Sequence, residues 1–96
     1  MLKKLLNIFK RPTIEISTPL KTLRDVDIFD TVWIKDKSGI VYEGWIYDKT
    51  NKHIVITVVT EEGVYKDYRF IINKINKNIS EIEQNHNILY FNKLCK

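Results

Sequence analysis

The chain has 96 residues, a formal net charge of +4 at neutral pH, 44% hydrophobic residues and 29% charged residues. This composition is that of a single soluble globular domain and excludes an intrinsically disordered chain, while the mild positive charge permits an anionic partner. The only cysteine, Cys95, excludes an internal disulfide and favours a reducing compartment, so we expect a cytoplasmic protein. The bias toward Ile, Lys and Asn, with no alanine, is typical of an AT-rich genome such as that of a low-GC bacterium or one of its phages.

The first segment, MLKKLLNIFK, places four large apolar side chains at helical spacing among basic residues: Leu2, Leu5, Leu6 and Phe9. Pro12 ends this predicted helix, which divides the chain into an N-terminal amphipathic helix at 1–12 and a small β-barrel domain at 13–96. The apolar run is too short and interrupted for a signal peptide or a membrane span. Three roles remain open: docking on the barrel or a neighbouring subunit, contact with a membrane surface through residues 1–11, or a frayed tail.

The remainder of the chain reads as short strands separated by turns. TIEIS predicts an edge strand, and TPLKTLRD predicts a capped helical turn. Gly39 and Gly63 mark turns between strands. The predicted strands lie at residues 26–35, 40–48, 53–60 and 64–72, with one or two more within 79–93. About five short strands predict a mainly β protein, a small and strongly bent barrel with a short N-terminal helix.

Gly44 interrupts a strand of large residues, IVYEGWIYD. Glycine in a strand interior costs about 0.5–1 kcal/mol relative to alanine, so a local requirement must select it. One reading is a sharp bend of the barrel; the other is a close approach by a ligand or a second chain. Tyr42, Gly44 and Ile46 share one face of this predicted strand, and Trp45 and Tyr47 share the other.

Residues 30–57, which contain DTVWIKDKSGIVYEGWIYDKTNKHIVI, resemble the first motif of the Sm-like family, a group of small SH3-like barrels. The matching positions are Val32, Ile34, Gly39, Tyr42, Gly44, Ile46, Ile54 and Ile56. This resemblance implies a strongly bent five-stranded barrel and rings formed by edge-strand pairing between subunits. It also implies a ligand site built from the loops KTNKH and NKINKN.

These two polar loops contain most of the residues that we predict to bind ligand. Lysine supplies a mobile positive charge for phosphate, and asparagine can pair with base edges. The predicted ligand-binding residues are Lys49, Asn51, Lys52 and His53 in the first loop and Asn73, Lys74, Asn76 and Lys77 in the second. The alternative is that both loops are ordinary solvated surface.

Trp45 and Tyr47 complete the predicted ligand-binding set, because exposed aromatic side chains on strands stack on bases. They can equally fill an interface between subunits or pack beneath the N-terminal helix. The two histidines, His53 and His86, have no partner at metal-ligand spacing. No phosphate loop and no nucleophile motif is present, so we expect no catalytic residue, no metal and no cofactor.

The sequence therefore predicts a non-enzymatic homo-oligomeric binding module for a phosphate-bearing ligand, either RNA or a small nucleotide signal. One specific form is a phage-type anti-defence sponge that sequesters such a signal. The alternative function is a protein- or membrane-docking assembly module that uses the N-terminal helix and the surface aromatics.

Overall fold

The computed structural model describes residues 13–14 and 20–95, and this part of the chain is mainly β with no helix. The N-terminal helix expected at 1–12 and the first two residues of the predicted capped turn TPLKTLRD, Thr18 and Pro19, lie outside the described residues. The strands are β1 (Thr13–Ile14), β2 (Thr31–Lys35), β3 (Val41–Lys49), β4 (His53–Val59), β5 (Tyr65–Ile71), β6 (Glu81–Gln84), β7 (Asn87–Tyr90) and β8 (Leu94–Cys95).

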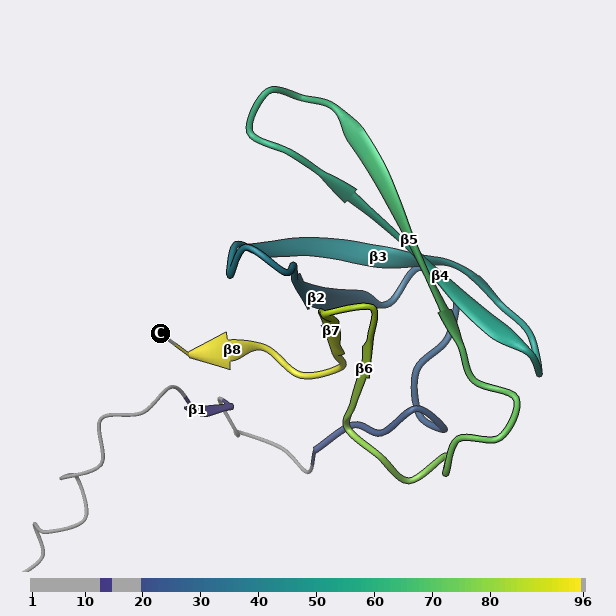
Figure 1. Cartoon of the computed structure of the whole chain (residues 1–96). Helices are drawn as coiled ribbons and strands as arrows, with labels where there is room; N and C mark the ends of the chain where they lie inside the picture. Colours follow the sequence, from purple (N-terminus) through teal and green to yellow (C-terminus); the bar gives the residue numbers. More distant parts are fainter. Residues whose placement is uncertain (1–12, 15–19, 96) are drawn as a thin grey trace, which may run out of the picture.

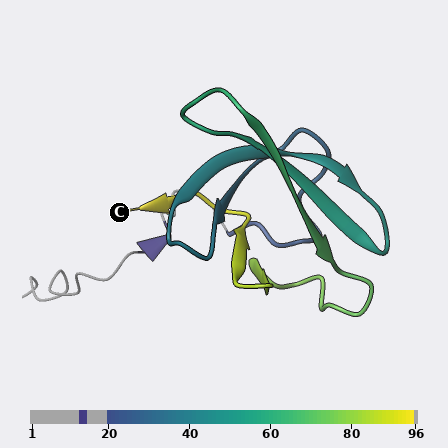
Figure 2. The same cartoon turned by 45° about the horizontal axis from the view of Figure 1, so that its top comes forward.

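Six of these strands form one antiparallel sheet in the order β5-β4-β3-β2-β7-β6. The sheet curls into a half-barrel, and the long strands β3, β4 and β5 bend across one another (Figures 1 and 2). β1 and β8 form a separate pair in which Thr13 lies opposite Cys95. The prediction of a mainly β, strongly bent fold is confirmed, although the main sheet has six strands instead of about five.

The concave side of the curled sheet holds the hydrophobic core. Val32 and Ile34 of β2 are fully buried, and Ile46 of β3 lies on the same side, as the alternation of the sequence predicted. The other core side chains come from β4 to β7 and from the connecting segments: Leu23, Val26, Ile54, Ile56, Val58, Phe70, Ile72, Ile82, Leu89 and Phe91.

Gly44 of β3 lies opposite Val58 of β4. A Cβ atom added there would lie 2.2 Å from the carbonyl oxygen of Thr57 and 2.6 Å from Cγ1 of Val58. Real Cβ atoms do not approach backbone this closely, so the strand needs glycine at this point. The glycine therefore serves the close approach of two paired strands of the same chain.

The segment before β2 differs from its prediction. Residues 26–30 were expected to begin a strand, but β2 begins at Thr31, and a turn closed by the Asp30 amide and the Asp27 carbonyl (3.0 Å) precedes it. Carboxylates stabilise this turn, because the Asp27 amide donates to Oδ2 of Asp30 and the Ile28 amide donates to Oδ1 of Asp27. The helical turn expected within LKTLRD is a single hydrogen-bonded turn between Thr22 and Asp25.

The C-terminal part forms a hairpin of β6 and β7. Asn85 and His86 occupy its two-residue loop with φ of 55° and 67°. Two successive left-handed residues are the requirement of a type I′ turn, which suits the twist of the flanking strands. β7 then pairs with β2, which places this hairpin at one edge of the main sheet, beside β2.

Candidate ligand-binding pocket

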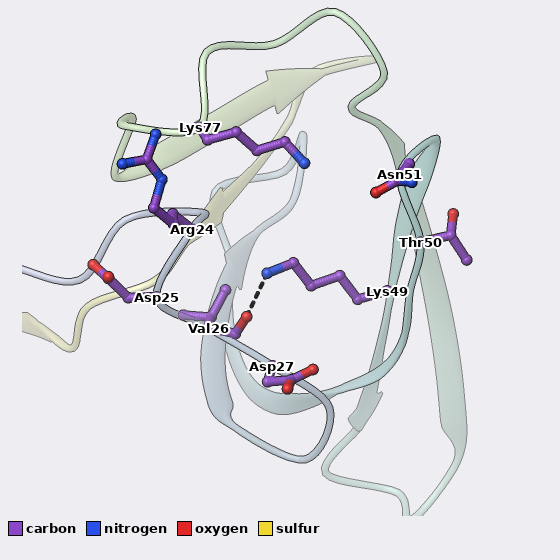
Figure 3. Close-up of a pocket in the computed structure, with 8 residues that line it drawn as sticks. All are labelled: Arg24, Asp25, Val26, Asp27, Lys49, Thr50, Asn51 and Lys77. Carbon is purple, nitrogen blue, oxygen red and sulfur yellow. Dashed lines mark hydrogen bonds between the residues drawn. The ribbon is translucent and has the colours of Figure 1, made fainter.

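An open pocket of about 530 Å³ lies between the β3–β4 loop, the β5–β6 loop and the segment that precedes β2 (Figure 3). The two polar loops singled out in the sequence thus meet at one site. The lining residues are Arg24, Asp25, Val26, Asp27, Lys49, Thr50, Asn51 and Lys77. Three of the ten predicted ligand-binding residues, Lys49, Asn51 and Lys77, are among them.

Backbone hydrogen bonds hold the walls of the pocket together. The Leu23 amide donates to the Ile79 carbonyl (2.9 Å), and the Arg24 amide donates to the Lys77 carbonyl (3.0 Å). The Ile72 amide donates to the Lys52 carbonyl (2.9 Å), which ties the β5–β6 connection to the β3–β4 loop. These contacts between backbone atoms join the segment before β2 to the β5–β6 loop, and that loop to the β3–β4 loop.

Lys49 extends from the end of β3 across the pocket. Its Nζ donates to the carbonyl of Leu23 (2.8 Å) and to the carbonyl of Val26 (Figure 3). Burial lowers the pKa of the Lys49 ammonium, and the nearby charge of Lys77 lowers it further, against the opposing effect of Asp27. An ammonium group has three donors, so one N–H of Lys49 remains for a ligand.

Lys77 enters the same pocket from the opposite wall, and its side chain extends toward that of Lys49 (Figure 3). Within the described residues, the ammonium group of Lys77 makes no hydrogen bond or ion pair. Arg24 lies on the same wall, with its guanidinium group directed away from the pocket centre (Figure 3). Three cationic and two anionic side chains therefore line the pocket, and the ammonium groups of Lys49 and Lys77 converge within it.

The carboxylates at the pocket are engaged in local turns. Oδ2 of Asp25 accepts hydrogen bonds from the Thr22 amide (2.9 Å) and from Oγ1 of Thr22 (3.1 Å). These bonds lower the pKa of the Asp25 carboxyl, which points away from the pocket (Figure 3). Asp27 accepts from the amide of Ile28 at 2.8 Å. The carboxylates thus shape the walls of the pocket and leave Lys77 without an ion-pair partner among the described residues.

The other predicted loop residues lie elsewhere. His53 is held within the sheet, with Nε2 3.2 Å from Oδ2 of Asp48 and Nδ1 3.3 Å from a guanidinium nitrogen of Arg69. Oδ1 of Asn76 accepts from the amide of Asn78 (2.8 Å) and so shapes its own loop. Three predicted residues are exposed and do not line the pocket: Lys52, Asn73 and Lys74.

The two predicted aromatic residues have different surroundings. Trp45 is partly buried and packs edge-on against Tyr65, with ring centroids 6.2 Å apart. Tyr47 is 63% exposed and lies at a bulge, since Ile46 pairs with Ile56 and Asp48 with Val55. Neither ring lines the pocket.

The sequence did not single out Arg24 and Asp27 for the pocket. They lie far along the chain from both loops, and only the backbone contacts of the preceding segment bring them there. The sequence signal for them is the cluster of acidic and basic residues just before the first long strand. Such a cluster is also typical of residues that only stabilise a turn.

Two searches for particular features were negative within residues 13–14 and 20–95. No group of three His, Cys, Asp or Glu side chains is arranged to hold a metal ion. No helix in this part of the chain has the length and apolar character needed to cross a membrane.

Comparisons with protein-family models, with curated proteins and with solved structures found no significant match to this chain.

Proposed function

We propose that this chain is a non-enzymatic binding module for a phosphate-bearing ligand, which it holds in the pocket between Lys49 and Lys77. The observation that carries this proposal is the convergence of two ammonium groups, from separate loops, on one pocket. Like charges held close together repel each other, and a bound anion would offset that repulsion. Charge-assisted hydrogen bonds from lysine to phosphate are among the stronger polar contacts in proteins.

The size of the pocket supports a small ligand. Its volume of about 530 Å³ lies within the range of small-molecule sites. The side-chain amide of Asn51 lies on the rim beside the cationic groups and would supply uncharged polar contacts. The hydroxyl of Thr50 instead accepts from the amides of Lys52 and His53 within its own loop. These features favour a small nucleotide over a long RNA as the ligand, and are compatible with a protein that sequesters a nucleotide signal.

We further propose an Sm-like or SH3-like barrel that assembles into a homo-oligomer. The bent sheet and the close approach of β3 and β4 at Gly44 support the barrel type. β5 is an edge strand of the sheet, and Tyr65 and Ile71 on it are exposed, as is Val64 just before it. Gln84 occupies the backbone groups of Ile71 at one end of this edge, but the apolar side chains at its start, Val64 and Tyr65, favour pairing with another chain. Native mass spectrometry would measure the subunit number, and a monomer at micromolar concentration would reject this part of the proposal.

The binding test uses two lysines of one loop. Calorimetric titration with pyrophosphate and with nucleoside diphosphates should show binding to the unmodified protein. Lys77→Glu should weaken that binding by about tenfold or more, since it replaces an attractive charge in the pocket by a repulsive one. Lys74→Glu makes the same charge change in the same loop, outside the pocket, and should bind nearly as the unmodified protein does.

Equal weakening by both substitutions would indicate a diffuse charge effect and reject the pocket as the site. Binding of RNA alone, with a steep decrease on adding salt, would identify RNA as the ligand. If no phosphate compound binds, the exposed apolar side chains of β5 favour the second candidate function, docking of a protein partner.

A further inference from the structure

Phe29 is unusual for a phenylalanine in both its backbone conformation and its exposure. Its backbone has φ of 74°, and its side chain is 77% exposed. Bulky residues rarely adopt left-handed backbone, and a large aromatic side chain is usually buried. Among the described residues with positive φ, the others are glycine, asparagine or histidine, which tolerate this conformation.

The local geometry explains why the backbone needs this conformation. The Asp30 amide closes a turn onto the Asp27 carbonyl (3.0 Å), with Phe29 at the third position. The Phe29 amide donates to the Ile46 carbonyl (2.8 Å), and the Ile46 amide donates to the Asp30 carbonyl (3.0 Å). Phe29 and Asp30 therefore lie together opposite Ile46, which is a β-bulge whose first position is usually a left-handed glycine.

The phenylalanine gains little from the fold in return for this strain. Its exposed ring receives little of the stabilisation that burial gives to an aromatic side chain. Glycine or asparagine at Phe29 would satisfy the turn without strain. A rigid aromatic group is thus displayed to solvent at a position where the fold alone favours another residue, and such exceptions concentrate at functional sites.

This turn is also part of the pocket. Asp27, its first residue, lines the pocket together with Lys49. The hydrogen bond to Ile46 places Phe29 beside the β3 bulge, where Tyr47 is also exposed. An exposed aromatic side chain therefore belongs to the same turn as Asp27, which lines the pocket, and lies two residues further along the chain.

From this juxtaposition we infer that the ligand is a nucleotide whose base stacks on Phe29 while its phosphate binds between Lys49 and Lys77. The inference rests on the proposed function and narrows it, because inorganic phosphate, polyphosphate and phosphopeptides do not require an aromatic platform. Stacking tolerates any base, since every base has a π-face, so this contact selects nucleotides as a class. Tyr47 is a candidate second aromatic contact for the base.

The test compares two ligands that carry a base with one that does not. Calorimetric titrations would use ADP, UDP and pyrophosphate against the unmodified protein, Phe29→Gly and Phe29→Leu. We expect Phe29→Gly to weaken binding of the nucleoside diphosphates by about 5- to 150-fold, the range that corresponds to loss of one base–aromatic stack. Pyrophosphate affinity should stay within about twofold, because the lysines are unchanged. Phe29→Leu should weaken nucleotide binding as much as Phe29→Gly does, because leucine has no ring to stack on a base. Leucine keeps the apolar bulk, so this variant separates stacking from general apolar contact.

Thermal unfolding provides an independent readout. Phe29→Gly should unfold at the same temperature as the unmodified protein or higher, because glycine relieves the left-handed strain. Phe29→Asn is the second variant and should behave alike in both assays, since asparagine tolerates this backbone. A clear decrease of the melting temperature in both variants would show that the ring stabilises the fold and would overturn the inference.

The outcomes separate the inference from the proposed function. If pyrophosphate and nucleotides both bind and Phe29→Gly changes neither affinity, the stacking inference fails while the phosphate pocket stands. If neither ligand class binds the unmodified protein, both proposals fail. Repeating the titration with a short oligoribonucleotide distinguishes a free nucleotide from RNA. If ADP or UDP binds at least as tightly as the oligoribonucleotide does, the ligand is a small molecule. Retention of nucleotide affinity by Phe29→Leu would show that apolar bulk suffices and would reject stacking.

Discussion

The side-chain amide of Gln84 pairs with both backbone polar groups of Ile71. The Ile71 amide donates to Oε1 of Gln84 (2.8 Å), and Nε2 of Gln84 donates to the Ile71 carbonyl. These residues lie on β6 and β5, the two edge strands of the main sheet. One glutamine thus makes the hydrogen bonds that a further strand residue would make, and joins the two edges of the half-barrel at one point.

Replacing Gln84 should open this connection. Gln84→Ala is expected to lower the free energy of unfolding by about 1–3 kcal/mol, because two hydrogen bonds are lost and the Ile71 backbone groups are left for water. Hydrogen exchange at the Ile71 amide should accelerate more than exchange at the β3 and β4 amides. Glu83→Ala on the same strand is the matched control, since Glu83 is exposed. Unchanged exchange at Ile71 in Gln84→Ala would show that the edges stay joined without this side chain.

Gly44→Ala tests the close approach of β3 and β4 at Gly44. The new Cβ would meet backbone atoms of Thr57, which cannot move without disturbing the β4 pairing. We expect a loss of about 1–3 kcal/mol in the free energy of unfolding, typical of overpacking. Urea unfolding would measure this loss, with Gly63→Asn as the control. Gly63 has open space around its Cβ position and a φ of 84°, which asparagine tolerates. A stability equal to that of the unmodified protein would reject the close approach.

The sequence predicted best those parts of the fold that depend on alternation. The buried Val32, Ile34 and Ile46 follow from it, because a strand with one face on the core has a period of two. The hairpin turn at Asn85 and His86 was also readable, as a polar pair that tolerates left-handed backbone, but it was not singled out.

The sequence pattern did not predict the turn at residues 27–30, and the reason is physical. Its left-handed position holds Phe29, so the glycine that normally reveals such a turn is missing. The β-branched and aromatic residues of VDIF then favour a strand. The pocket was predicted in part, since both loops that form it were singled out. Its third wall, which includes Arg24, depends on backbone hydrogen bonds between distant segments, and no local pattern encodes those.

Asp25 should make the free energy of unfolding decrease as the pH falls into the acid range. The hydrogen bonds from Thr22 lower the pKa of this carboxyl below its usual value of 3.8. A carboxyl with a lowered pKa in the folded state binds fewer protons than in the unfolded state. Its stabilising contribution is therefore complete above the unfolded pKa and is lost as the pH falls through the lower, folded pKa.

Urea unfolding of Asp25→Asn between about pH 2 and pH 5 would test this, because asparagine does not titrate there. The variant should lose less stability on acidification than the unmodified protein does. Glu62→Gln is a control, since Glu62 is exposed in a turn. Identical acid limbs for Asp25→Asn and the unmodified protein would contradict the role of Asp25.

Lys49 lines the pocket and also holds the segment before β2 through its hydrogen bonds, so its replacement should affect both ligand binding and stability. Lys49→Met removes the hydrogen bonds to the carbonyls of Leu23 and Val26 and should cost about 1–3 kcal/mol of unfolding free energy. Lys52→Met is the matched control, because Lys52 is exposed in the adjacent loop. Chemical unfolding of both variants at neutral pH would measure the difference, and equal stabilities would reject the tethering role of Lys49.

The pKa of Lys49 gives a second test with a defined sign. Burial lowers this pKa below 10.5, so at pH values between the folded and unfolded pKa the folded state binds fewer protons. The contribution of Lys49 to stability therefore rises with pH across that interval, and Lys49→Met should lack the rise. A bound phosphate would raise the pKa of Lys49 by favouring its charged form. Pyrophosphate should thus reduce the alkaline rise in the unmodified protein, and an alkaline limb that is the same with and without the ligand would place the bound phosphate away from Lys49.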